Sequence, residues 1–149
     1  MERMENHRIE FKSRLSDGLE KEVVAFLNYP GGGTIFIGID KNGAIIGVNN
    51  SDECQLLIKN RLITNIEPSC LGLFDVVSEK EGDKDLVKIR IASGQERPYY
   101  VKKYGMSPKG AFIRTGSAAE PMSVRMIEDL FTKRLKTSIR VIESPDQDL

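Results

Sequence analysis

The chain has 149 residues, enough for one hydrophobic core, so we expect one domain with a C-terminal extension. Its 22 basic and 22 acidic residues cancel, which excludes a strong overall field toward nucleic acid or an anionic membrane, and any polyanion site must come from local clustering. Two cysteines exclude a disulfide framework or a cysteine metal site, and no apolar run approaches the length that crosses a bilayer, so we expect a cytoplasmic protein without a membrane partner.

The first half of the chain predicts a strand, a helix and a hairpin. Residues 8–12 (RIEFK) alternate apolar and charged side chains, the period of a half-buried strand. Residues 15–33 carry apolar side chains at helical spacing and end on Pro-Gly, a helix stop. Two β-rich runs, 34–40 and 44–48, flank an Asn-Gly pair that favours a tight hairpin turn.

The next segments predict a second helix and four further strands. Residues 51–69 repeat apolar side chains at helical spacing, with a cap at the first or second residue and an end before a proline. Runs 74–80 and 85–93 flank a polar turn, so we expect a second hairpin. Residues 97–103 and 110–117 predict two more short strands around a loop.

A third helix is expected over 123–135, after a serine cap. We interpret residues 1–136 as the domain and 137–149 as a linker or the start of a further C-terminal region. The order β-α-(ββ)-α-(ββ)-(ββ)-α predicts an α+β domain with a mainly antiparallel mixed sheet and helices packed on it.

The glycines at 31–33 raise the question of a phosphate-binding loop. In such a loop the glycines open a helix and a lysine follows, whereas these glycines follow a helix and enter a strand with no lysine after them. We therefore interpret them as a helix stop. Asp40, at the end of the next strand, either caps its own turn or joins other carboxylates at a metal, and the sequence leaves both open.

Acidic residues near the N-terminus are the candidates for further metal ligands beside Asp40. Glu10 and Lys12 share one strand face, so an ion pair between them is one interpretation. Glu5 lies five residues earlier, a spacing that points it to the opposite face of a continuous strand. A shared site would therefore need a turn near Asn6 and His7, and His7 itself is a weaker candidate for a ligand or a general base.

Cations and aromatic rings gather in residues 97–117. Such a surface suits a nucleic-acid backbone and stacked bases, although tyrosines that belong to the core would explain the same pattern. The candidate nucleic-acid contacts are Arg97, Tyr99, Lys102, Lys103, Lys109, Arg114 and Ser117.

A resemblance to a known family lies in three segments: ENHRIEFK, VAFLNYPGGGTIFIGIDKNGAIIGV and RPYYVKKYG followed by AFIRTGSAAEPMS. Together they resemble the Schlafen AlbA-type DNA-binding domain of bacterial regulators and RecG-related proteins, over residues of about 5–135. The resemblance implies the same fold and a nucleic-acid-binding module of a transcriptional regulator or RecG-related protein, with DNA or RNA as its partner.

The resemblance also implies an enzymatic alternative. In vertebrate Schlafens, two such lobes cleave structured RNA with two glutamates and one aspartate on a divalent metal. The matching positions are Glu5, Glu10 and Asp40, which would be catalytic and would hold Mg²⁺ or Mn²⁺, while Lys12 would position the backbone. A single lobe would need a homodimer to form the cleft. A protein-interaction domain that binds neither DNA nor RNA is a third alternative, because a net charge of zero does not by itself indicate a polyanionic partner.

Overall fold

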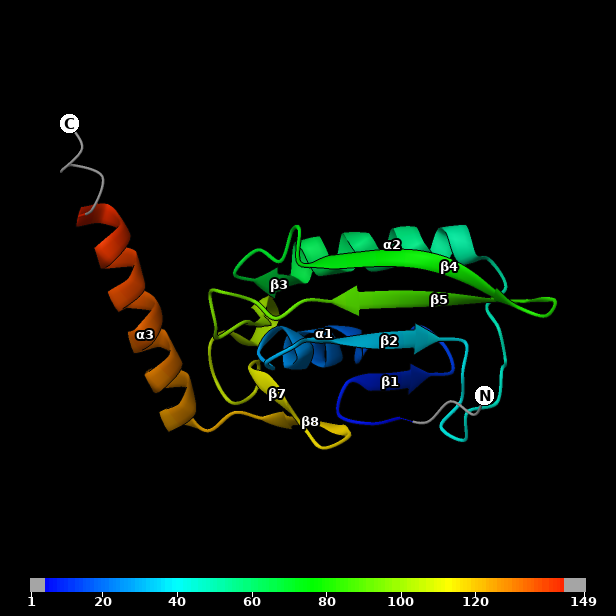
Figure 1. Ribbon diagram of the computed structural model, residues 1–149, viewed down its shortest axis with the longest axis horizontal. Coiled ribbons are helices and arrows are strands. Elements are labelled where there is room, and N and C mark those ends of the chain that lie inside the picture. The colour runs from blue at the N-terminus through cyan, green and yellow to red at the C-terminus, as the bar shows by residue number, and fades with distance from the viewer. Residues whose placement is uncertain (1–4, 144–149) are drawn as a thin grey trace.

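The computed structural model describes residues 5–143, and side chains as far as residue 137. Its centre is a four-stranded sheet in the order β1-β2-β5-β4 (Figure 1). The strands are β1 (Ile9–Lys12), β2 (Gly33–Ile37), β4 (Phe74–Glu81) and β5 (Lys84–Ile91). Only β1 and β2 run parallel, and the other neighbours are antiparallel, so the prediction of a mainly antiparallel mixed sheet is confirmed.

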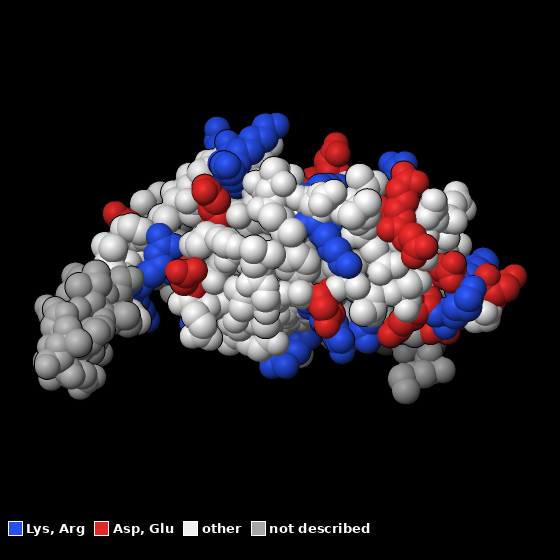
Figure 2. Space-filling view, turned by 90° about the horizontal axis from the view of Figure 1, so that it is seen from above, with Lys and Arg blue, Asp and Glu red and all other residues white. Residues whose placement is uncertain are grey.

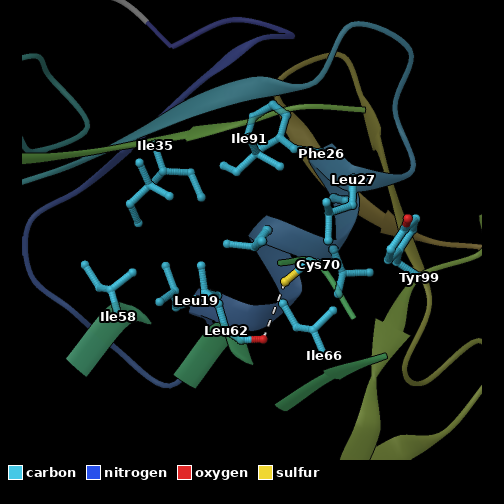
Figure 3. Packing of buried hydrophobic residues seen from close by; sticks show 14 of the residues in the cluster. Leu19, Phe26, Leu27, Ile35, Ile58, Leu62, Ile66, Cys70, Ile91 and Tyr99 are labelled. Atoms are coloured by element: carbon cyan, nitrogen blue, oxygen red, sulfur yellow. Dashed lines mark hydrogen bonds between the residues drawn. The ribbon is translucent and has the colours of Figure 1, made fainter. Parts of the chain in front are cut away.

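Two helices, α1 (Leu19–Leu27) and α2 (Ser51–Asn65), cover one face of this sheet. Alternate apolar residues of β2 and β5, among them Ile35 and Ile91, pack against both helices (Figure 3). The cap of α2 is Asn50, whose side chain accepts a hydrogen bond from the backbone of Glu53 at 3.1 Å. The cap therefore lies one residue before the predicted pair.

The opposite face of the sheet carries a smaller cluster of Phe11, Phe36, Ile39 and Leu86. The chain after β2 turns back here with a single bridge between Ile39 and Ile45. The predicted hairpin over 34–48 is thus present as a turn with one bridge, and its second arm is not a full strand.

Two small two-stranded sheets complete the described fold, and one of them includes the segment between α2 and β4. β3 (Ile66–Glu67) pairs with β6 (Tyr100–Val101), which leads into a short 3-10 helix, η1 (Lys102–Tyr104). β7 (Phe112–Thr115) pairs with β8 (Ala118–Pro121) across a turn. The strand expected over 97–103 is therefore only two residues long, and β8 was not predicted, because its sequence AAEP has no strand periodicity.

The last helix, α3 (Val124–Glu143), stands at one end of the molecule (Figure 1). The Ser123 hydroxyl accepts a hydrogen bond from the backbone of Met126, which confirms the predicted cap. The helix continues beyond residue 135 and includes part of the segment 137–149 that we interpreted as a linker; residues 144–149 lie outside the described part. None of the helices in residues 5–143 has the length and apolar character needed to cross a bilayer.

Asn28, at the end of α1, joins the helix to the second half of the chain. Its side chain is 1% exposed, and its amide nitrogen donates to the carbonyls of Tyr99 and Phe112 at 2.9 and 2.8 Å. Its amide oxygen accepts from the backbone of Tyr99 at 2.8 Å. These three buried hydrogen bonds hold residues 99–112 against α1.

We expect Asn28→Ala to lower the free energy of unfolding by on the order of 3 kcal/mol, because it leaves three buried backbone groups without partners. Urea unfolding followed by circular dichroism measures this. Asn60→Ala, an exposed position on α2, is the matched control and should change stability by less than about 0.5 kcal/mol. Equal effects of the two substitutions would show that the Asn28 hydrogen bonds do not hold this segment.

Candidate nucleic-acid interface

A groove of about 810 Å³ lies between the start of α1, the end of α2 and residues 101–112. It is lined by four cations and two aromatic rings: Lys21, Arg61, Lys103, Lys109, Tyr104 and Phe112. Of the described residues, Asp17 and Glu20 are the acidic ones in its lining. The groove therefore gathers positive charge in a chain whose net charge is zero.

Two of the predicted nucleic-acid contacts, Lys103 and Lys109, line this groove, and Lys102 is exposed beside them on η1. Lys21 and Arg61 were not predicted. They come from α1 and α2 and meet the tyrosine-lysine segment only in the folded chain, so no local sequence pattern could have indicated them.

One of the four cations is already neutralised. Arg61 forms two hydrogen bonds with the carboxylate of Glu20, and Asn65 donates a third at 2.8 Å. Burial by itself raises the pKa of Glu20, but these hydrogen bonds together outweigh it and lower the pKa. Glu20 therefore stays ionised and holds Arg61 against the wall of the groove.

The three lysines of the groove form no ion pair with a described residue. The ammonium of Lys103 lies 5.4 Å from the ring centre of Tyr104, and that of Lys21 lies 5.3 Å from the ring centre of Phe112. Lys109 is exposed. Their charges are thus available to an anionic ligand.

Arg114, which we predicted to contact nucleic acid, is instead in the interior. It is 2% exposed, and its guanidinium lies over the ring of Phe26 at 4.8 Å. One terminal nitrogen is 2.7 Å from Glu10 and 3.4 Å from Glu22. Arg114 cannot reach a polymer, and its role in the described structure is an ion pair that joins β7 to β1 and α1.

The partly exposed Lys12 borders these buried charges, and we call the four residues Glu10, Lys12, Glu22 and Arg114 the Arg114 cluster. The ammonium of Lys12 lies 3.4 Å from Glu10 and 3.7 Å from Glu22. The same-face pair of Glu10 and Lys12 suggested by the sequence is therefore formed, and the partly exposed lysine is engaged by two carboxylates of the protein. Burial, and then the neighbouring charge of Glu10, raises the pKa of Glu22.

Glu22 is the member that the sequence analysis missed. It lies three residues after Leu19 and four before Phe26, so it falls on the apolar stripe of α1. An acidic residue on a buried stripe indicates a buried partner, and that signal could have found it.

The N-terminal segment turns as a shared site would require. Asn6 and Ile9 exchange backbone hydrogen bonds at 3.1 and 3.2 Å, and the other terminal nitrogen of Arg114 donates to the carbonyls of both residues. The turn brings Glu5 back along β1, where its carboxylate accepts a hydrogen bond from the backbone of Phe11 at 2.9 Å. Burial, opposed by that hydrogen bond and aided by Glu10, raises the pKa of Glu5.

Asp40 is not part of this arrangement. One of its carboxylate oxygens accepts hydrogen bonds from the backbones of Asn42 and Ala44, both at 2.9 Å, and so caps its own turn. Among the side chains that the structure describes, residues 5–137, no three carboxylate, histidine or cysteine groups are placed to hold a metal ion. Because Glu10 is already neutralised by Arg114 and Lys12, the donor set does not fit Mg²⁺ or Mn²⁺, and metal-dependent cleavage stays a prediction without a matching site.

The remaining predicted contacts lie apart from the groove lining. Tyr99 is 1% exposed and belongs to the main core (Figure 3). Arg97 is half-buried, and Ser117 is exposed in the turn between β7 and β8. The glycines at 31–33 also have a structural explanation, since a Cβ on Gly32 would meet the carbonyl oxygen of Ile91 at 2.0 Å.

Solved structures define the class of fold. The chain is similar to the DIP2311 protein from Corynebacterium diphtheriae, with a TM-score of 0.61, 23% identity, and coverage of 83% of this chain and 23% of that one. It is also similar to the N-terminal domain of an ATP-dependent DNA helicase RecG-related protein from Nitrosomonas europaea, with a TM-score of 0.54, 19% identity and 78% of each chain covered. At these identities the likeness concerns the fold alone.

The sequence itself identifies the family. The model of the family described as Schlafen, AlbA_2 matches residues 5–123, and the chain belongs to that family. The resemblance stated from the three sequence segments is thus confirmed. A comparison with curated proteins gave no match.

Removal of the Arg114 guanidinium should strongly destabilise the fold. We expect Arg114→Met to lower the free energy of unfolding by about 3–5 kcal/mol, because Glu10 and Glu22 lose a buried partner. The triple variant Arg114→Met, Glu10→Gln, Glu22→Gln removes the uncompensated charges and should recover part of this loss. Chemical unfolding measures both, and a loss below about 0.5 kcal/mol for Arg114→Met would contradict the role assigned to the ion pair.

The lowered pKa of Glu20 predicts a specific pH dependence. Its ordinary pKa is 4.5, so the stabilisation that it contributes is complete above about pH 4.5 and is lost as the pH falls through the lowered value. We therefore expect the difference in free energy of unfolding between the native protein and Glu20→Gln to shrink at lower pH. Urea unfolding at a series of pH values measures it, and a constant difference would argue against an ionised Glu20.

Proposed function

We propose that this domain binds DNA or RNA through the groove, as a module of a bacterial-type regulator or RecG-related protein. The observation that carries the proposal is the groove itself, where three lysines that form no ion pair within the described part of the chain lie beside an exposed tyrosine. Family membership supports it, and so does the likeness to the N-terminal domain of a protein described as a DNA helicase RecG-related protein.

The charge distribution favours a local site over a broad one. On the face that Figure 2 shows, small groups of Lys and Arg and of Asp and Glu are scattered over a mostly uncharged surface, and no large area carries positive charge alone. The lysines of the groove, Lys21, Lys103 and Lys109, are therefore the expected phosphate contacts. Three contacts predict a slope of log affinity against log salt concentration of about −2 for a single strand and about −3 for a duplex.

Removal of these three charges should remove most of the binding. We expect Lys21→Ala, Lys103→Ala, Lys109→Ala to weaken binding of a labelled oligonucleotide and to bring the salt slope close to zero. Fluorescence anisotropy at several salt concentrations measures both.

The matched control carries the same change in net charge outside the groove: Lys41→Ala, Lys59→Ala, Lys136→Ala. It should retain the affinity and the slope of the native protein. An equal loss in both triple variants would place the site elsewhere, and no binding by the native protein would favour a protein-interaction domain.

A further inference from the structure

We propose that the groove binds a single strand, not a duplex, with one base stacked on the ring of Tyr104. This inference rests on the proposed function, and it adds the form of the polymer and the residue that recognises its bases. It stands on the exposure of that ring, on the rigidity of the segment that carries it and on the concave shape of the site.

The ring of Tyr104 is unusually open for an aromatic side chain. Tyr104 as a residue is 51% exposed, whereas Phe112, which supplies the other ring of the groove lining, is buried. An exposed ring beside a lysine offers a stacking surface for any base, since every base has a π-face. In a duplex those faces are covered by neighbouring base pairs, so only an unpaired base can use this surface.

The segment that carries the ring is held by its own backbone. The nitrogen of Val101 donates to the carbonyl of Gly110 at 2.9 Å, and the nitrogens of Gly110 and Ala111 both donate to the carbonyl of Ser107. The Ser107 hydroxyl donates to the carbonyl of Tyr104 at 3.1 Å. A ring on such a closed loop loses little conformational entropy when a base stacks on it.

Gly110 makes this closure possible. A Cβ at that position would meet the carbonyl oxygen of Gly105 at 2.2 Å and the Cβ of Tyr104 at 3.2 Å. The two sides of the loop therefore pack directly against each other beneath the tyrosine, and the ring projects from a fixed base.

The shape and charge of the site also fit a single strand. A duplex is read by a convex helix or ribbon that enters its groove, but here the cations line a concavity of about 810 Å³. Lys103 and Lys109 belong to the segment that carries the tyrosine, and Lys21 belongs to α1. Phosphates can contact these lysines while the base between them lies on the ring.

The test compares three probes of equal length, about 15 nucleotides: a mixed-sequence single strand, the same strand in a duplex, and an abasic strand with the same phosphates. Each is made as DNA and as RNA, and the sugar that binds the native protein more tightly is used throughout. The variants are Tyr104→Leu, which keeps apolar bulk without a ring, and Tyr104→Phe, which keeps the ring.

We expect the single strand to bind more tightly than the duplex. Tyr104→Leu should weaken binding of the base-bearing strand by about ten-fold or more and leave binding of the abasic strand unchanged, while Tyr104→Phe should behave as the native protein. Tighter binding of the duplex, or an equal effect of Tyr104→Leu on the base-bearing and abasic strands, would overturn the inference and leave the proposed function intact. If no probe binds, the proposed function fails and this inference fails with it.

Discussion

A buried arginine holds the two halves of this fold together. The guanidinium of Arg114, on β7, contacts Glu10 on β1 and Glu22 on α1, and its second terminal nitrogen binds the turn at residues 6–9. Segments more than ninety positions apart in sequence therefore meet at one cation. A buried charge is costly without partners. The packing of each segment around the guanidinium is therefore stable only when the other segments are also in place.

The same helix that supplies Glu22 to the interior also builds one wall of the groove. Glu20 and Lys21 lie beside Glu22 on α1 and point into the concavity, while Asn28 at the end of the helix fixes residues 99–112 opposite. The position of the exposed tyrosine relative to the lysine of α1 thus depends on the buried polar contacts. The polar residues of α1 thus position the candidate interface, while the apolar residues of the same helix belong to the main core.

Much of the fold follows from the sequence. Alternation predicted β1, and β-rich runs beside turn residues predicted β2, β4 and β5. Apolar spacing together with cap and stop residues predicted all three helices, although on α2 Leu56, Leu57 and Ile63 are exposed and only Ile58 and Leu62 are buried. The short strands were harder: β6 has two residues and β8 has no alternation, so both are defined only by their partners. The site was predicted in part, since Lys103 and Lys109 belong to a local cationic run, whereas Lys21 and Arg61 join them only through tertiary packing. The sequence could not show that Arg114 and Tyr99 point inward, because exposed and buried hairpin residues carry the same alternation.

The central claim is that the polymer lies in the groove between α1, α2 and residues 101–112. Titration of the isotope-labelled domain with a short oligonucleotide, followed by backbone amide chemical shifts, tests it most directly. The account predicts that the largest shifts occur at Lys21, Lys103, Tyr104 and Lys109, with small changes on the opposite face of the sheet around Lys88 and Arg90. Shifts concentrated on that opposite face, or in the β7–β8 turn near Ser117, would contradict it.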